Sequence, residues 1–314
     1  MTAHRLAWLL VAALPIAQAQ TVALSGELTV VGSDTASGLM AHAADAFAAR
    51  HPAVRVQLQS MGSASAPAAL TEGAADIGAM SRAMLPDEEQ AFVRRWGYPP
   101  TRFLVAHDAI AVIVHPDNPI PSLSLAQVDA IYSDTLRCGA AAPIADWNDI
   151  APSTRALGSR PILAIGRDAG SGTHERFRQV ALCGGAYRAD VVAWPGNGRI
   201  VASVMENPHA IGYVGTGYLN GVVRAVPLAA TAQDAPAEPD AANIAAGRYA
   251  LSRAVYVYVN RPEGRALPRQ VAAFVAVLLS DDEQALVGGT GLVSLTPDER
   301  RSQRMLLGQA AHLQ

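Results

Sequence analysis

Residues 162–182, which read ILAIGRDAGSGTHERFRQVAL, pass from a buried strand through a turn of small residues into a helix. The apolar run Ile162–Ile165 predicts the strand, and Thr173–Leu182 has the pattern of a helix. The same succession of strand, small polar turn and helix recurs along the chain. Such a β-α-β-α order implies parallel sheets with helices on both faces, so the sequence predicts an α/β fold.

Apolar runs and helical patterns place the other elements of this fold. Strands are expected at 28–31, 54–58, 76–79, 109–115 and 255–259. Helices are expected from about Met40 to Ala48 and at 67–72, 86–96, 125–132, 267–279, 281–287 and 297–309. The segment 229–247 is rich in alanine, proline and aspartate, which predicts an exposed loop.

Composition narrows the class of protein. The chain has 314 residues, of which 50% are hydrophobic and 16% are charged, so it can bury a substantial core. A formal net charge of −3 argues against a general nucleic-acid or membrane-surface binder. All 24 basic residues other than histidine are arginine. The lack of lysine excludes a P-loop lysine, a Schiff-base lysine and a Ser-x-x-Lys acylase.

The beginning of the chain has the pattern of an export signal. Arg5 is followed by the apolar run Leu6–Ile16 and by the small-x-small site Ala17-Gln18-Ala19. We therefore expect residues 1–19 to be a cleaved signal peptide, the mature chain to start near Gln20, and the protein to reside in the periplasm. No later stretch reaches the about 20 apolar residues of a membrane-spanning helix.

Two cysteines are present, Cys138 and Cys183. Because exported chains meet an oxidising environment, we predict one disulfide between them, and two buried free thiols are the alternative. The bond would close a loop of about 45 residues, worth about 4 kcal/mol in the chain-entropy model. No cysteine–histidine cluster surrounds either residue, so no metal site is expected.

Several strands end in glycine, serine or threonine just before a helix begins. Helix N-termini offer unpaired N–H groups to anions, hydroxyls add donors, and arginine matches the geometry of phosphate or sulfate. Each turn alone is ordinary capping chemistry, but four of them with two arginines predict an anion site. The turns are Gly32–Thr35, Gly62–Ser65, Ser81-Arg82 and Gly170–Thr173, the last with Arg167 just upstream.

Enzymatic alternatives find little support in the motifs. Gly166–Thr173 lacks the lysine of a P-loop, and Ala169–Gly172 is not a Gly-x-Ser-x-Gly elbow. Ser171 with His174 as base would suggest a secreted phosphohydrolase or acyl-transfer enzyme, but no third group stands at a recognisable spacing. We expect His174 to be a solvent-facing residue in the first turn of its helix.

Gly166–Thr173, followed by Phe177, resembles the arginine/Ser-Gly-Thr signature of periplasmic phosphate-binding proteins of the PstS-like family. Further stretches stand in the order of that family, so the resemblance covers nearly the whole mature chain. These stretches are Gly32–Thr35, Gly62-Ser63, Ala75–Arg82, Gly196–Gly198 and Ala210–Tyr213.

The resemblance implies a type II periplasmic-binding-protein fold, in which two α/β lobes close on a ligand. The chain would cross between the lobes near 108–112 and 250–256, giving lobe 1 at 20–109 and 256–314 and lobe 2 at 110–255. The resemblance also implies a monomer that binds inorganic phosphate and delivers it to a membrane ABC permease. Neither catalysis nor a cofactor is implied.

The resemblance also implies which residues hold the anion. Ser81 stands where some family members carry an acceptor aspartate and others have the Ser-Arg found here. Arg82 would either contact the anion or pair with a carboxylate. The expected donors are Thr35, Ser63, Arg167, Ser171, Gly172 and Thr173.

Selectivity would depend on one acceptor. Phosphate near neutral pH keeps a proton that it can donate, whereas sulfate has none, so a carboxylate in the site would favour phosphate. Asp34 is the candidate for this acceptor, and an N-cap of the following helix is the alternative role for it. If Asp34 does not face the ligand, the alternative that the protein binds sulfate or a metal oxyanion gains support.

Overall fold

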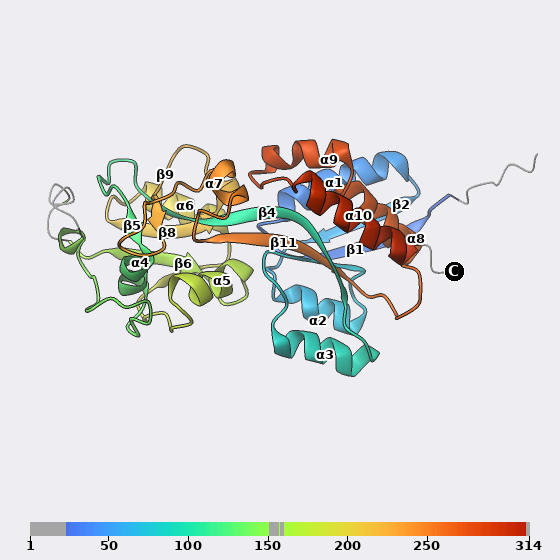
Figure 1. The fold of residues 1–314 in the computed structure, drawn as a ribbon, viewed down its shortest axis with the longest axis horizontal. Coiled ribbons are helices and arrows are strands. Elements are labelled where there is room, and N and C mark those ends of the chain that lie inside the picture. The colour runs from blue at the N-terminus through green and yellow to red at the C-terminus, as the bar shows by residue number, and fades with distance from the viewer. Residues whose placement is uncertain (1–22, 151–156, 158–159, 312–314) are drawn as a thin grey trace, which may run out of the picture.

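Two long strands join the two lobes of the molecule. The computed structural model of the protein describes residues 23–150, 157 and 160–311, so the predicted signal peptide at 1–19 and the predicted mature start at Gln20 lie outside it. Figure 1 shows β4 (Thr101–Val114) and β11 (Ser252–Val259) running between the lobes. These strands confirm the two predicted crossovers. The predicted lobe boundaries at 109/110 and 255/256 fall within β4 and β11 and stay a prediction.

Lobe 1 is built on the strand order β2-β1-β3-β11-β4. Strand β1 pairs in parallel with β2 and β3, and apolar residues of these strands form one core with α1, α8 and α10. A second cluster, with α2 and α3, covers the opposite face (Figure 1). The bounds are β1 Gly26–Gly32, α1 Ser37–Arg50, β2 Val54–Gln59, α2 Ser65–Glu72, β3 Ile77–Met80, α3 Pro86–Trp96, α8 Arg269–Leu278, α9 Asp281–Leu286, η4 Val287–Thr290 and α10 Pro297–Ala311.

Lobe 2 continues the same sheet in the order β4-β8-β6-β7. One core lies under α4 and α5, and a second one lies under α6 on the other face. Both lobes thus have the predicted helices on both faces. The bounds are β5 Leu123–Ser124, α4 Leu125–Tyr132, η1 Trp147–Asp149, β6 Leu163–Arg167, α5 Gly172–Ala181, β7 Val192–Trp194, α6 Asn197–Met205, β8 Ala210–Gly215, η3 Thr216–Tyr218, β9 Arg224–Ala225, β10 Leu228–Ala229 and α7 Ala241–Ala245.

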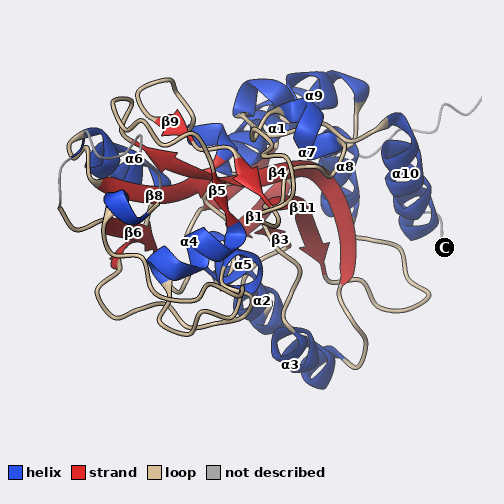
Figure 2. Ribbon diagram, turned by 60° about the vertical axis from the view of Figure 1, so that its left-hand side comes forward, coloured by secondary structure: helices blue, strands red, loops and turns tan. Residues whose placement is uncertain are grey.

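One expectation about local structure was wrong, and another was right only in part. The sheet is mixed, because β11 runs antiparallel to β3 and β4, and β4 runs antiparallel to β8. Figure 2 shows the strands of both lobes as one curled layer. The segment 229–247, predicted as an exposed loop, is exposed over most of its length, but it also contains the short helix α7, which Asp240 caps and which buries Ile244 against the core of lobe 2. One apolar residue in a polar segment was too weak a pattern to predict a helix.

The predicted disulfide is present and links Cys138 to Cys183. Cys138 follows α4 and Cys183 follows α5, so the bond ties together two helices that share one core of lobe 2. The sequence separation of 45 residues makes this a long-range constraint on the unfolded chain.

Removal of this disulfide should lower the stability of the protein. We expect the double substitution Cys138→Ser and Cys183→Ser to decrease the free energy of unfolding by about 4 kcal/mol, because the unfolded chain regains its loop entropy. Guanidinium denaturation of both proteins, with and without reductant, measures this difference. Reductant should destabilise only the parent protein. Equal midpoints for the parent and the double variant would show that the bond does not stabilise the fold.

Candidate anion-binding site

The loops predicted to hold an anion meet where the strands of both lobes end and helices begin. Two backbone hydrogen bonds bring the loops of lobe 1 together: Ser33 N–H donates to Ala79 O at 2.8 Å, and Gly62 N–H donates to Gly32 O at 2.9 Å. The loop after β6 in lobe 2 approaches them, since Ala64 N–H donates to Gly170 O at 3.2 Å. The turns before α1, α2 and α5 therefore converge between the lobes.

The hydroxyl groups of these loops are buried and close together. Ser63 Oγ lies 3.3 Å from Ser81 Oγ and accepts a hydrogen bond from Ser81 N–H at 3.1 Å. Across the lobes, Thr35 Oγ1 lies 3.4 Å from Thr173 Oγ1. Buried hydroxyls can rotate to donate to a common acceptor, so they suit an oxyanion.

The N-terminus of α5 closes over the serines of lobe 1. Ser171 caps this helix by accepting a hydrogen bond from Thr173 N–H at 3.1 Å. A Cβ atom at position 172 would collide with Ser63 Oγ and lie 3.0 Å from Ser81 Oγ. Glycine is needed at position 172 because only a residue without a side chain allows this approach.

Arg167 is the strongest sign of an anion site. Its side chain is 1% exposed, and Nη2 donates to Asp34 Oδ1 at 2.9 Å and to Pro195 O at 2.7 Å. Its Nε and Nη1 are buried and have no acceptor among the described residues. Buried guanidinium N–H groups without partners are costly, and an anion between the lobes would satisfy them.

The carboxylate of Asp34 bonds to two residues of lobe 2. Besides the ion pair with Arg167, its Oδ2 accepts a hydrogen bond from Asn197 Nδ2 at 3.0 Å. The N-cap of α1 is Ala36, which makes no side-chain capping bond, so the capping role considered for Asp34 is wrong. The carboxylate instead reaches across to lobe 2 and retains lone pairs for a further donor.

Arg253 is a site residue that the sequence did not indicate. It lies on β11, where Nη1 donates to Thr173 Oγ1 at 2.8 Å and Nη2 to Thr35 Oγ1 at 3.3 Å. Its charge is balanced by Asp108 on β4, which accepts from Nε at 2.7 Å and from Thr216 Oγ1 at 2.8 Å. The two charged side chains are 1% and 0% exposed. A buried cation thus orients one threonine from each lobe.

Arg82 pairs with a carboxylate, one of the two roles considered for it. Its Nη1 and Nη2 donate to the two oxygens of Glu88 at 2.7 and 2.6 Å. Glu88 also accepts from Leu85 N–H at 2.8 Å, which completes the N-terminus of α3. This pair fixes the loop that carries Ser81.

His174 was expected to face solvent, and this was wrong. Its ring stacks on Tyr187 with centroids 4.4 Å apart, and its Nδ1 bonds to Arg167 O at 2.8 Å. Burial lowers the pKa of His174, which favours a neutral ring that donates through Nδ1. The ring therefore supports the Arg167 loop, while Ser171 Oγ is engaged at the helix cap.

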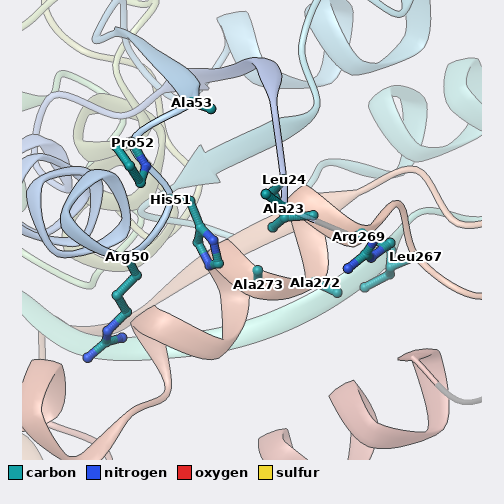
Figure 3. Close-up of a pocket in the computed structure, with 10 residues that line it drawn as sticks. All are labelled: Ala23, Leu24, Arg50, His51, Pro52, Ala53, Leu267, Arg269, Ala272 and Ala273. Atoms are coloured by element: carbon teal, nitrogen blue, oxygen red, sulfur yellow. The ribbon is translucent and has the colours of Figure 1, made fainter. Parts of the chain in front are cut away.

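Another pocket, at the far end of lobe 1, has a different lining (Figure 3). It has a volume of about 610 Å³ and lies between the end of α1 and the start of α8, with side chains that include Leu24, Pro52, Leu267 and Ala273. Its polar side chains come from Arg50, His51 and Arg269, without serine or threonine.

In the part of the chain that the structure describes, no cluster of metal-ligating residues and no helix able to cross a membrane is found.

Comparisons with known proteins agree with this geometry. Residues 17–282 match the family described as PBP superfamily domain. The phosphate-binding protein PstS of Pseudomonas aeruginosa strain PAO1 is 41% identical over 272 residues, which are 87% of this chain and 84% of that protein. A Clostridium perfringens protein solved with bound phosphate has a TM-score of 0.71 and 26% identity, over 86% of this chain and 100% of that one. An ABC-type phosphate transport receptor from Vibrio cholerae, with 24% identity, shares the fold at a TM-score of 0.66 over 85% of this chain and 100% of that one. The chain therefore belongs to the periplasmic-binding-protein superfamily and, within it, to the family of the phosphate-binding proteins PstS.

Proposed function

We propose that the protein captures inorganic phosphate between its lobes and performs no chemistry on it. The observation that carries this proposal is Arg167, whose buried Nε and Nη1 atoms have no acceptor among the described residues and lie on a residue that bonds to Asp34 beside the turns with buried hydroxyls. The names of the curated relatives, which are phosphate-binding proteins, support the same ligand. Affinity would come from many preoriented donors around a desolvated anion.

Each predicted site residue has a place in this proposal. The hydroxyls of Thr35, Ser63, Ser81 and Thr173, the N-terminal backbone of α5 at Ser171 and Gly172, and Arg167 donate to the phosphate oxygens. Asp34 accepts the phosphate proton. Arg82 holds the Ser81 loop through Glu88, and Arg253 orients the two threonines.

Isothermal titration of refolded, ligand-stripped protein with phosphate, and then with sulfate, tests this function at pH 7. We expect saturable phosphate binding and far weaker sulfate binding, because sulfate offers no proton to Asp34. Sulfate binding without phosphate binding would assign the site to the alternative oxyanion. Absence of heat with both anions would contradict anion capture.

Substitution of Asp34 by asparagine should reduce the selectivity for phosphate. We expect the ratio of the two dissociation constants to fall by about 10- to 100-fold, because an amide can donate to sulfate and one mismatched buried group costs about 1–3 kcal/mol. Titration of Asp34→Asn with both anions measures the ratio. Asp45→Asn, an exposed substitution on α1, is the matched control. An unchanged ratio in Asp34→Asn would exclude Asp34 as the selective acceptor.

The proposed setting is an import system. The N-terminal pattern supports cleavage and export to the periplasm, and the fold supports presentation of both closed lobes to a membrane ABC permease. We propose that the protein acts there as a monomer. Radioactive phosphate uptake by cells with and without the gene tests the transport role.

A further inference from the structure

A pocket of about 300 Å³ lies where the two lobes meet β11, beside the site proposed for phosphate, with which it shares Arg82 and Arg253. We call it the hinge pocket and define it by the loop 82–86 of lobe 1, by Arg176 and Gln179 of α5, and by Arg253, Ala254 and Tyr256 of β11. Figures 1 and 2 show that α5 is the helix of lobe 2 beside α2 of lobe 1. A ligand in this pocket would contact both lobes at once.

The hinge pocket carries more positive than negative charge. Arg82 is paired with Glu88, and Arg253 is paired with Asp108. Arg176 has no carboxylate partner among the residues that the structure describes, and its bond from Nη2 to Ser252 O is long, at 3.3 Å. Burial, followed by the nearby charge of Arg253, lowers the pKa of Arg176. One guanidinium charge in this pocket is thus left without a counterion.

Two donors of the same pocket are also unsatisfied. The Nε–H groups of Arg82 and Arg176 are both buried without an acceptor in the described parts of the chain. Arg82 as a whole is only 6% exposed, so solvent reaches little of it. Two residues that line this pocket from opposite lobes thus each keep a buried N–H group without an acceptor among the described residues, and a bound oxygen ligand would relieve such a deficit.

The remaining lining favours an organic anion over an inorganic one. Met84, Leu85 and Pro86 contribute aliphatic surface, which suits a carbon skeleton. Arginine binds a carboxylate through two parallel hydrogen bonds. We propose that the hinge pocket binds a small di- or tricarboxylate, which bridges Arg176 of lobe 2 to the Arg82 loop of lobe 1.

Occupation of the hinge pocket should be coupled to phosphate. Because the pocket is formed by both lobes, its ligand stabilises the closed arrangement in which the phosphate loops also meet. The coupling, which rests on the proposed function, is reciprocal: citrate should tighten phosphate binding by the same factor by which phosphate tightens citrate binding.

Titration of phosphate-saturated protein with citrate tests the site, because saturation blocks the phosphate site against the carboxylate. We expect saturable citrate binding that weakens by about tenfold or more in Arg176→Gln, the loss of one charge-assisted pair. Arg248→Gln, an exposed substitution in lobe 2 with the same change of charge, should bind citrate as the parent does. Ala254→Leu fills the pocket without removing a charge and should also abolish citrate binding.

The outcomes separate this proposal from the proposed function. Phosphate binding is measured first on each preparation, and its failure in the parent protein contradicts phosphate capture. Normal phosphate binding without saturable citrate binding, or equal citrate affinity in the parent and Arg176→Gln, overturns the hinge pocket. Saturation of the pocket by excess phosphate instead of citrate would also overturn the choice of an organic carboxylate.

Discussion

Replacement of Arg167 by lysine should weaken phosphate binding by about 100- to 1,000-fold, although the charge is kept. Lysine is a point charge without the planar fork, so the donors now at Nε and Nη1 are lost. A hydrogen bond to a charged group contributes about 1.5–3 kcal/mol, and loss of two of them near the lower end of this range gives a change of this size. The same substitution also disturbs the Asp34 ion pair, which is 2.9 Å long.

Calorimetric titration with phosphate measures this effect on Arg167→Lys. Arg199→Lys is the matched control, because Arg199 lies on α6 of the same lobe and is exposed over the Trp194 ring. The control should bind phosphate as the parent does. Retention of affinity within about threefold in Arg167→Lys, less than 1 kcal/mol, would show that these N–H groups do not bind the anion.

Substitution of Arg253 by methionine should both destabilise the fold and weaken phosphate binding. Arg253 and Asp108 form a fully buried pair, and removal of one partner leaves the other as an uncompensated buried charge. We expect the free energy of unfolding to fall by about 3–5 kcal/mol. Phosphate binding weakens because Thr35 and Thr173 lose the cation that orients their hydroxyls.

A double variant separates these two effects. Arg253→Met combined with Asp108→Leu removes both charges, which should restore most of the lost stability. Phosphate binding should stay weak, since the threonines are still unsupported. Urea denaturation and phosphate titration of the single and double variants provide both measurements. Full recovery of phosphate affinity in the double variant would reduce Arg253 to a stabilising residue.

Arg50→Met is the control for loss of an ion pair. Arg50 lies 3.7 Å from Asp282 in a pair whose side chains are 48% and 87% exposed. Exposed pairs contribute about 1 kcal/mol or less, so this substitution should change stability little. A loss as large as that of Arg253→Met would contradict the role given to burial.

The local sequence predicted most of the helices and the anion loops, because their signals are short in range. Each small polar turn and each apolar run lies within a few residues of sequence. The two cysteines allow only one pairing. The helix at 86–96, for example, has the predicted bounds, since Pro86 begins it and Gly97 ends it. The direction of β11 could not be read in the same way, because a strand that crosses between lobes pairs with residues about 150 positions away, as Arg253 does with Asp108.

The partners of the site residues were also beyond the local pattern. Asp34 gave an ambiguous signal, since a cap and a long-range acceptor look alike in a turn. Arg253 lay just before the predicted strand at 255–259, so it was not recognised as a buried charge at the beginning of β11. Its partner Asp108 likewise lay just before a predicted strand, the one at 109–115. Asn197 was part of a recognised stretch, but its contact with Asp34 depends on the packing of both lobes.

The hydrogen bond from Ala64 to Gly170 and the close approach of Gly172 to Ser63 join the two lobes beside the proposed anion site. An anion bound between the lobes would depart after these contacts open. The lifetime of the complex is then the waiting time for that opening, whatever the diffusion rate of the free ion. If a membrane partner drives this opening, that partner would determine when the anion is released.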